Sequence, residues 1–292
     1  MARFGRVITA MVTPFSASGD LDIEAAKELS QWLVETGSEG LVVGGTTGES
    51  PTLSDSELMA LSRAVRDSVS VPVIVGTGSN DTRHAVELTK RAHDTGADAV
   101  LSVTPYYNRP PQSGIAAHFA AIAKASPLPV IVYDVPVRTG RKIELSTLIH
   151  LANDVENIVG FKDAAGDIAS TARLIDAAGP HFEVYSGDDN ITLPLLAVGA
   201  VGLISVASHW AGRQFVSMFD AWESGDLAAA RRENAKLFSS FEFEGSADIP
   251  NPLPVKAMLR VLGLAVGECR LPIGPAPEGL EDRAREVLAT LK

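Results

Sequence analysis

Residues 40–50 read GLVVGGTTGES, a short apolar run that passes directly into a glycine-rich polar turn. An apolar run of this length that does not alternate with polar residues is typical of a strand buried on both faces, as in a parallel sheet. A capping box follows at Ser54–Glu57 and predicts a helix with Leu58, Leu61 and Val65 on its buried face. This stretch therefore predicts one strand, one turn and one helix in succession.

The same succession recurs along the chain, with helical periodicity between the apolar runs, as at 22–37, 82–92, 146–151 and 169–178. Eight such strands fit a closed (β/α)₈ TIM barrel better than an open doubly wound sheet, which usually has fewer strands and a glycine fingerprint after the first. The predicted strands are Val7–Val12, Gly40–Val43, Val71–Val75, Ala97–Val103, Pro129–Tyr133, Asn157–Lys162, Glu183–Ser186 and Gly202–Val206.

The chain has 292 residues, of which 46% are hydrophobic, enough to bury a large core. The part that follows the eighth predicted strand reads as helices. We therefore expect a catalytic barrel domain over residues 1–223 and a C-terminal helical domain over residues 224–292. The helices predicted there are Ala211–Glu223, Leu227–Phe241, Pro254–Leu262 and Gly279–Leu291.

Composition excludes several classes of function. The 25 Lys and Arg against 36 Asp and Glu give a net charge of -11, which argues against a general nucleic-acid binder. The one cysteine, Cys269, excludes an intramolecular disulfide and a multi-cysteine metal site, and we expect it to be structural. No apolar run approaches about 18 residues and no signal peptide is evident, so we expect a cytoplasmic protein without membrane contact.

Lys162 is unusual among the eight lysines because it stands inside the apolar run Ile158–Lys162. The active site of a barrel lies at the carboxyl ends of its strands, where this run ends. Burial removes solvation from the charged amine and lowers its pKa, which supplies the neutral amine that a Schiff base with a carbonyl requires. A lysine that reaches solvent or pairs with Asp163 is an equally good interpretation of the pattern alone.

Other polar residues follow the predicted strands. Thr46 and Thr47 lie in the glycine-rich turn, which could bind a carboxylate or be an ordinary tight turn. Tyr107 and Tyr133 could relay protons, although tyrosine is also a common strand residue, which is the simpler interpretation. Arg138 suits a carboxylate but could equally be a surface charge.

Six motifs in order along the chain resemble the 4-hydroxy-tetrahydrodipicolinate synthase (dihydrodipicolinate synthase) family of class I pyruvate aldolases. The resemblance implies a (β/α)₈ barrel with a C-terminal helical domain, a homotetramer built as a dimer of dimers, and no cofactor or metal. The substrates implied are pyruvate and L-aspartate 4-semialdehyde, in the first committed step of diaminopimelate and lysine synthesis. The motifs are Gly45–Ser50, Thr104–Pro110, Tyr133–Gly140, Val159–Asp163, Ser186–Asp189 and Gly202–Val206.

The resemblance also implies roles for individual residues. Lys162 would form the imine with pyruvate, and a proton relay would consist of Tyr133, Thr46 and Tyr107. Tyr107 would reach into the site of a neighbouring subunit across a dimer interface. The resemblance implies four further binding contacts: Thr47 for the pyruvate carboxylate, Arg138 for the semialdehyde carboxylate, and the backbone of Gly187 and Ile204 around Lys162.

Two alternatives remain open at this point. The first is another pyruvate-dependent aldolase or lyase, such as an N-acetylneuraminate lyase or a hydroxy-oxoacid aldolase. Such lyases resemble this chain in the lysine and tyrosine but typically carry an apolar residue at the position of Arg138 and Ser at that of Thr46, which favours the synthase. The second is a regulator without catalytic activity, which the complete set of relay residues disfavours.

The chain departs from the family pattern in two places. Asp134 replaces a more frequent Asn, for which we expect a tuning effect on activity. In the region that binds lysine as a feedback inhibitor, His84 stands where sensitive members carry Glu, and Asp55 and Leu58 stand where they often carry His. Histidine cannot supply a fixed negative charge to an ammonium group, so we predict weak or absent inhibition. The residues that match a possible allosteric site are Ser50, Asn80 and Tyr106.

Overall fold

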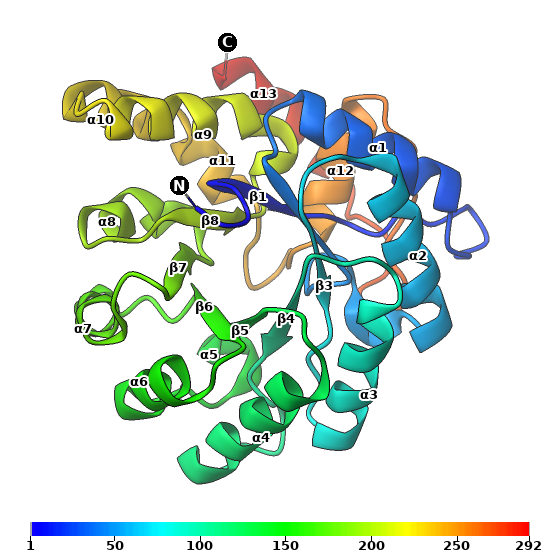
Figure 1. Cartoon of the computed structure of the whole chain (residues 1–292). Coiled ribbons are helices and arrows are strands. Elements are labelled where there is room, and N and C mark those ends of the chain that lie inside the picture. The colour runs from blue at the N-terminus through cyan, green and yellow to red at the C-terminus, as the bar shows by residue number, and fades with distance from the viewer. Residues whose placement is uncertain (1, 292) are drawn as a thin grey trace.

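The computed structural model describes residues 2–291, and eight parallel strands close into a barrel in the order of the sequence (Figure 1). Each predicted strand is present, with ends that differ by at most two residues. The predicted (β/α)₈ TIM barrel is confirmed. The strands are β1 (Val7–Ala10), β2 (Gly40–Val43), β3 (Val73–Gly76), β4 (Ala99–Val103), β5 (Val130–Asp134), β6 (Ile158–Asp163), β7 (Glu183–Ser186) and β8 (Gly202–Ser205).

Helices surround the barrel and continue beyond it (Figure 1). They are α1 (Ile23–Glu35), η1 (Ser50–Thr52), α2 (Asp55–Ser68), α3 (Thr82–His93), α4 (Gln112–Ala125), α5 (Pro136–Thr139), α6 (Leu145–Asp154), α7 (Ile168–Ala178), η2 (Asp189–Ile191), α8 (Thr192–Ala197), α9 (Ser208–Glu223), α10 (Leu227–Lys236), α11 (Phe238–Phe243), α12 (Leu253–Val261) and α13 (Leu280–Thr290).

Side-chain caps explain where several of the helices begin. Asp22, Ser54, Asp81, Asp167 and Asp226 each accept a hydrogen bond from a backbone N–H in the first turn of α1, α2, α3, α7 and α10. Such caps satisfy backbone donors that have no partner within the helix. The capping box predicted at the start of α2 is present in both directions.

The structure corrects the helix assignments in two places. The single helix predicted over Leu227–Phe241 is divided into α10 and α11 at Leu237, which is fully buried in the apolar cluster that extends from the barrel. The last barrel helix starts at Ser208 rather than Ala211, where the backbone departs from helical geometry at φ −121° and ψ 23°. Periodicity does not register such breaks, because the apolar spacing continues across them.

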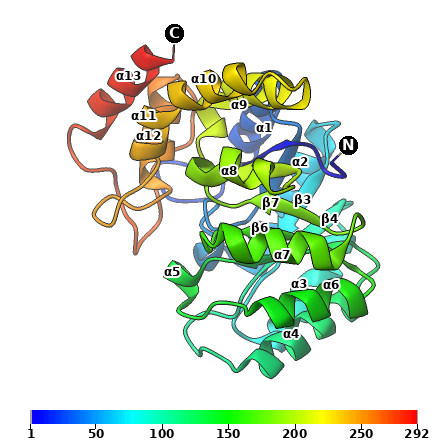
Figure 2. The same cartoon turned by 90° about the vertical axis from the view of Figure 1, so that its left-hand side faces the viewer.

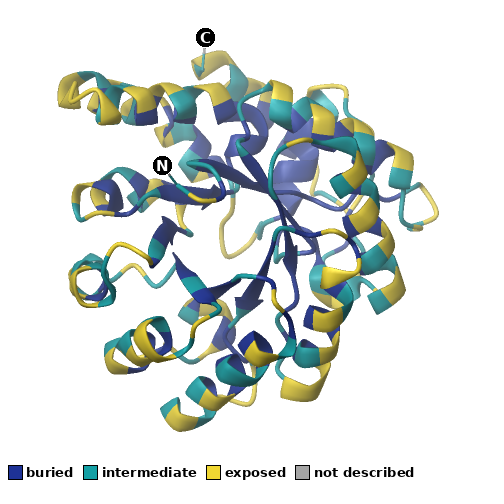
Figure 3. Ribbon diagram, viewed as in Figure 1, coloured by how far each residue is buried: buried dark blue, intermediate teal, exposed yellow. Residues whose placement is uncertain are grey.

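The interior of the barrel is a packed core and not a pore. Ile8, Val42, Ile74, Ile131 and Tyr185 belong to one cluster of buried side chains contributed by different strands. Figure 3 shows the strands almost uniformly buried, and the surrounding helices buried on the side that faces them. This rigid support ends at the carboxyl ends of the strands, where polar side chains replace the apolar ones.

The C-terminal helices pack against the barrel on one side. Figure 2 shows α11, α12 and α13 on the same side of the molecule as α5, which follows the carboxyl end of β5. Phe215 of α9 and Met258 of α12 belong to the same apolar cluster as Leu33 of α1. No helix within residues 2–291 has the length and apolar character needed to cross a membrane.

The predicted division into residues 1–223 and 224–292 falls between α9 and α10, and its outer ends, Met1 and Lys292, lie outside the described residues. Since one apolar cluster crosses this division, we propose that the C-terminal helices are an extension of the barrel that does not fold independently.

Candidate active site

Lys162 occupies the carboxyl-terminal part of β6 and is 5% exposed. It is paired in register with Tyr133 of the neighbouring strand β5, and its Nζ lies 4.3 Å from the centroid of the Tyr133 ring. A Cβ at Gly187 would lie 2.9 Å from Cγ of Lys162, so a larger residue there would crowd the lysine. Neighbouring strands thus hold the amine beside the phenol.

Burial lowers the pKa of Lys162 to about 8, the nearby Asp189 carboxylate opposes this effect, and Arg138 adds to it. A pKa of this value leaves about one tenth of the amine neutral at pH 7. The ion pair with Asp163 that the sequence left open is not formed among residues 2–291. Asp163 instead accepts hydrogen bonds from the backbone N–H of Ala165 and the hydroxyl of Thr171.

Lys162 lines a cavity of about 350 Å³ at the carboxyl ends of the strands. This cavity brings together six of the residues predicted from the sequence, together with apolar side chains from β1, β2 and β4. Its two positive side chains, Lys162 and Arg138, can receive a substrate that carries carboxylates. The predicted residues that line it are Thr46, Thr47, Tyr133, Arg138, Lys162 and Gly187.

Tyr133 and Thr46 line the cavity together. Burial raises the pKa of the Tyr133 phenol to about 12, while Arg138 and the neighbouring Thr46 side chain act in the opposite direction. A phenol with this pKa remains protonated at neutral pH and can donate to a developing alkoxide. The pair has the chemistry that the predicted relay requires.

Thr47 is held from the C-terminal part of the chain. Its Oγ1 accepts a hydrogen bond of 2.8 Å from Nδ2 of Asn251, which lies just before α12 and also lines the cavity. The second polar atom of Asn251, Oδ1, is buried without a hydrogen-bond partner within the described residues. The turn after β2 and the segment before α12 therefore form one wall of the cavity.

Two of the predicted catalytic and binding residues, Tyr107 and Ile204, do not line the cavity. Tyr107 is 89% exposed and adopts φ 72°, in the left-handed region that non-glycine residues seldom occupy. Ile204 of β8 is buried in the barrel interior with Tyr133. The cavity is lined near this strand by Val206 instead.

The possible allosteric residues lie around the turns after β2, β3 and β4. Ser50 begins η1, and the Asn80 carbonyl accepts a hydrogen bond from Asn108. His84 in α3 contacts the carboxylate of Asp55 at 3.0 Å, and Arg91 pairs with the same carboxylate at 3.1 Å. Tyr106 is partly buried in the turn after β4.

Sequence reasoning missed Asn251 and Glu244, which both line the cavity. Burial, together with the nearby carboxylates of Asp189 and Asp188, raises the pKa of Glu244 well above its usual range. Neither residue belongs to a strand end, and the only sequence signal near them is the proline-rich stretch Ile249–Pro254.

Across residues 2–291, no three His, Cys, Asp or Glu side chains are grouped so that they could hold a metal ion.

A profile of the dihydrodipicolinate synthetase family matches residues 3–291, almost the entire chain that forms this barrel and cavity. The chain belongs to the dihydrodipicolinate synthetase family. The family resemblance seen in the sequence is confirmed.

Relatives within the dihydrodipicolinate synthetase family match over nearly their full lengths. The 4-hydroxy-tetrahydrodipicolinate synthase of Synechococcus sp. (strain CC9902) is 48% identical over 99% of this chain and 96% of its own. The crystal structure of dihydrodipicolinate synthase from Bacillus anthracis has a TM-score of 0.96 at 44% identity and covers 100% of both chains. The enzyme from Cyanidioschyzon merolae, solved with lysine bound, has a TM-score of 0.95 at 44% identity, covering 99% of this chain and 98% of that one.

In this member of the dihydrodipicolinate synthetase family, Asp134 is fully buried directly after Tyr133. Its carboxylate accepts hydrogen bonds from the Ile143 N–H at 3.0 Å and from the Thr104 hydroxyl at 3.1 Å. Burial raises the pKa of Asp134 to about 6, these two hydrogen bonds oppose the shift, and the Asp163 carboxylate adds to it. The charged form of Asp134 is therefore disfavoured in the folded protein.

Replacement Asp134→Asn is expected to stabilise the protein at pH 7.5 by about 1–2 kcal/mol and to have little effect at about pH 3.5. A carboxyl group whose pKa is raised on folding binds more protons in the folded state. The stability of the natural chain should therefore fall as pH rises from about 4 to about 6, and the uncharged amide escapes this loss. Denaturant unfolding of both proteins at the two pH values measures the difference. Equal stability at pH 7.5 would contradict this account.

Proposed function

We propose that Lys162 performs the reaction of this family in this chain: the condensation of pyruvate with L-aspartate 4-semialdehyde to 4-hydroxy-tetrahydrodipicolinate. This is the first committed step of diaminopimelate and lysine synthesis. The observation that carries the proposal is the buried Lys162 amine, 4.3 Å from the Tyr133 ring centroid, in a cavity that also contains Arg138.

The first half-reaction makes an imine. The lone pair of neutral Lys162 Nζ attacks C2 of pyruvate, and the resulting carbinolamine loses water to give a protonated imine. The Tyr133 hydroxyl, which lines the cavity together with Thr46, donates the proton that leaves with the water. The imine accepts electrons from the adjacent C–H bond. The Tyr133 phenolate left by the first donation takes a proton from the pyruvate methyl group, which becomes the carbon nucleophile of an enamine.

The second half-reaction forms the carbon–carbon bond. The enamine carbon attacks the aldehyde of the semialdehyde, and the new alkoxide receives a proton from the Tyr133 relay. The amino group of the semialdehyde then adds to C2, which closes the ring, and passes one proton to Nζ of Lys162. The C–N bond to Lys162 breaks, the neutral amine leaves, and the ring nitrogen returns a proton to the Tyr133 phenolate. Arg138 at the cavity wall binds the carboxylate of the semialdehyde through paired N–H donors. Arg138 and Thr46 favour this reaction over that of an N-acetylneuraminate lyase.

The carboxylate of pyruvate is assigned to the turn after β2. Thr47 is 3% exposed and lines the cavity. Its hydroxyl accepts from Asn251, so the proton of that hydroxyl is free to donate to the carboxylate. Backbone N–H groups of the same turn add to this binding. The backbones of Gly187 and Ile204 surround the Lys162 stem in the same proposal.

A coupled assay tests the function directly. With pyruvate and L-aspartate 4-semialdehyde, the protein should form a product that a dihydrodipicolinate reductase consumes. With pyruvate and N-acetylmannosamine it should show no condensation. Activity with the sugar and none with the semialdehyde would contradict the proposal and indicate an N-acetylneuraminate lyase.

We propose that Tyr107 completes the relay of a neighbouring subunit, within a homotetramer built as a dimer of dimers. Its side chain is 89% exposed and its backbone is held at φ 72°. An exposed aromatic residue on a backbone of this kind is typical of a residue whose position serves a contact outside its own fold.

Complementation between two inactive variants tests the exchange of Tyr107. Tyr107→Phe and Lys162→Ala should each have low activity, but subunits unfolded and refolded together should regain part of it. Only a mixed dimer combines an intact Lys162 in one subunit with an intact Tyr107 from the other. Activity equal to the sum of the separate variants would contradict exchange, provided that native mass spectrometry shows mixed assembly.

We also propose that L-lysine is a weak inhibitor or none. The Asp55 carboxylate, which could attract an ammonium group near His84, already contacts His84 at 3.0 Å and Arg91 at 3.1 Å. Titration of L-lysine into the coupled assay should leave the rate unchanged up to millimolar concentrations. Half-inhibition at a micromolar to low-millimolar concentration would contradict the proposal.

A further inference from the structure

The turn that carries Thr46 and Thr47 contains a buried charge with no role in the reaction above. Glu49, in the same turn, is 1% exposed and adopts φ 56°, which is unfavourable for a residue with a side chain. Its backbone N–H donates to the carbonyl of Thr46 at 3.1 Å. The conformation of Glu49 and the position of Thr46 are therefore linked directly.

The partners of the Glu49 carboxylate come from the C-terminal part of the chain. Oε1 lies 2.7 Å from Nζ of Lys256 in α12, and both side chains are almost completely inaccessible to solvent. Oε2 accepts a hydrogen bond of 2.8 Å from the backbone N–H of Arg270. Segments more than 200 positions apart in the sequence thus meet at this carboxylate.

Lys256 and Arg270 are themselves fixed. Lys256 donates to the Glu268 carbonyl at 2.9 Å, and its Nζ lies 4.3 Å from the centroid of the Phe15 ring. The Arg270 guanidinium lies 4.2 Å from the centroid of the same ring. Charges that face an aromatic ring and several acceptors have little freedom to move.

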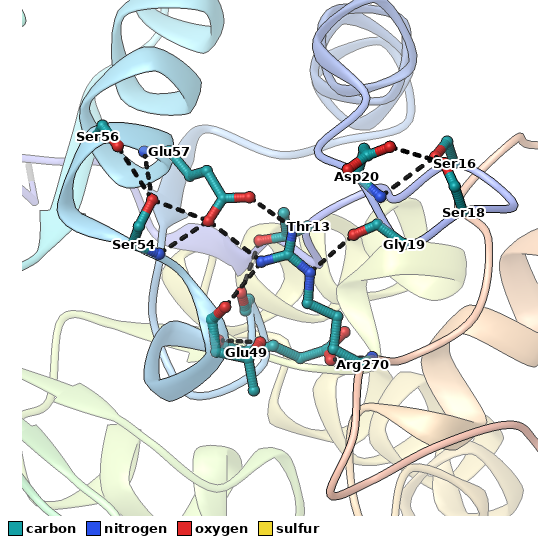
Figure 4. Close-up of polar contacts among 12 residues, drawn as sticks. Thr13, Ser16, Ser18, Gly19, Asp20, Glu49, Ser54, Ser56, Glu57 and Arg270 are labelled. Carbon is teal, nitrogen blue, oxygen red and sulfur yellow. Dashed lines mark hydrogen bonds and ion pairs between the residues drawn. The ribbon is translucent and has the colours of Figure 1, made fainter.

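Arg270 also holds the residues that follow the turn. Its guanidinium donates to the carbonyl groups of Thr52 at 2.7 Å and Gly19 at 2.9 Å, and it pairs with the Glu57 carboxylate. Figure 4 shows this guanidinium between Glu57 and Gly19, with the side chain of Glu49 beside it. The turn after β2 and the start of α2 are therefore both anchored to the segment that contains Arg270.

Stability alone is a poor explanation for the buried pair. Removing two charges from water is costly, and apolar residues of similar size often give equal or greater stability. What a buried ion pair can provide is one defined geometry, because any other placement leaves a charge without a partner.

We propose that the Glu49–Lys256 ion pair positions the Thr46–Thr47 turn, so that the C-terminal helices determine the geometry with which the barrel receives the pyruvate carboxylate. Glu49 and Lys256 are positioning residues, because neither lines the cavity. Asn251, which donates to Thr47, supplies a second link from the same part of the chain. This inference rests on the proposed role of Lys162 and of the turn.

The double variant Glu49→Gln/Lys256→Met separates positioning from stability. It removes both charges, keeps similar side-chain volumes and leaves an amide oxygen for the Arg270 N–H. We expect a folded protein in which half-saturation of Lys162 trapping by pyruvate and borohydride needs about tenfold more pyruvate, since small displacements of binding groups are costly. The trapped adduct at saturating pyruvate should still form.

The matched control is Glu233→Gln/Lys236→Met, which removes an ion pair of the same length, 2.7 Å, on the exposed face of α10. It should leave pyruvate half-saturation unchanged. A folded Glu49→Gln/Lys256→Met protein with normal pyruvate half-saturation would overturn the positioning role and leave the proposed function intact. Absence of any adduct in the natural chain would overturn the proposed function itself.

A second variant covers the case in which the double variant does not fold. Glu49→Asp keeps the charge but withdraws the carboxylate from Lys256 by one methylene group. We expect a rise in the pyruvate requirement of similar size in a protein that still folds, with a melting temperature lowered because the buried pair is lengthened. If the melting temperature falls while pyruvate half-saturation stays normal, the pair has only a structural role.

Discussion

Lys162→Ala is expected to lower kcat by a factor of about 10⁴ or more, because the carbon nucleophile of the reaction exists only on the imine. Among the described residues, Lys162 is the only lysine that lines the cavity, and its Nζ lies beside the Tyr133 ring. No other lysine is therefore placed to take over its role. Borohydride reduction with pyruvate should add mass to the natural chain at Lys162 and leave the variant unchanged.

The control for this variant is Lys236→Ala, which removes a half-exposed lysine of α10. It should retain both the activity and the adduct at Lys162. Substantial condensation by Lys162→Ala, or a pyruvate adduct on a different lysine, would refute the assigned nucleophile. Circular dichroism shows whether loss of activity in either variant comes from loss of structure.

The same amine predicts a pH dependence. Because burial lowers the pKa of Lys162 to about 8, kcat/KM for pyruvate should rise about tenfold per pH unit below that value and level off above it. If kcat/KM for pyruvate instead rises until about pH 10, the ordinary pKa range of a lysine, the amine is solvated in the working enzyme.

Arg138→Ala is expected to lower kcat/KM for the semialdehyde by about 100-fold, since a guanidinium binds a carboxylate through two charge-assisted hydrogen bonds. Arg138 lines the same cavity as Tyr133 and Lys162. The half-saturating concentration of pyruvate in borohydride trapping should change little, because we assign the pyruvate carboxylate to Thr47 and the turn around it.

A second effect distinguishes this role from a general loss of structure. Arg138 lowers the pKa of Lys162, so its removal should move the acid limb of kcat/KM for pyruvate to higher pH. Arg138→Lys should keep this limb in place and recover only part of the semialdehyde binding, because an ammonium lacks the planar fork of donors. Equal losses for pyruvate and semialdehyde would contradict the assignment.

Much of the site could be predicted because its reactive and polar residues stand at the ends of predicted strands or directly after them. Lys162 was recognisable as one lysine inside an apolar run, and the barrel topology then required it to face the same end as Thr46, Thr47 and Tyr133. The sequence left open whether Lys162 pairs with Asp163. In the structure the Asp163 carboxylate instead accepts hydrogen bonds from Ala165 and Thr171. The depressed pKa of Lys162 follows from that burial.

Contacts from the C-terminal part of the chain could not be predicted in the same way. Asn251, Glu244 and Lys256 lie outside the repeating strand–helix pattern, and nothing near them in the sequence indicates their partners. The split of one predicted helix at Leu237 has the same origin, because a buried contact interrupts a continuous apolar spacing.

The sequence by itself determined the barrel and the end at which its site lies, because local periodicity and a repeated order of strands leave few other topologies. It also singled out Lys162 as the candidate nucleophile. Only the tertiary structure decided how the Thr46–Thr47 turn is held, by Asn251 on one side and by the Glu49–Lys256 pair on the other. The physical reason is that hydrogen bonds and ion pairs between distant segments depend on where the folded backbone places them, and no local pattern encodes that placement.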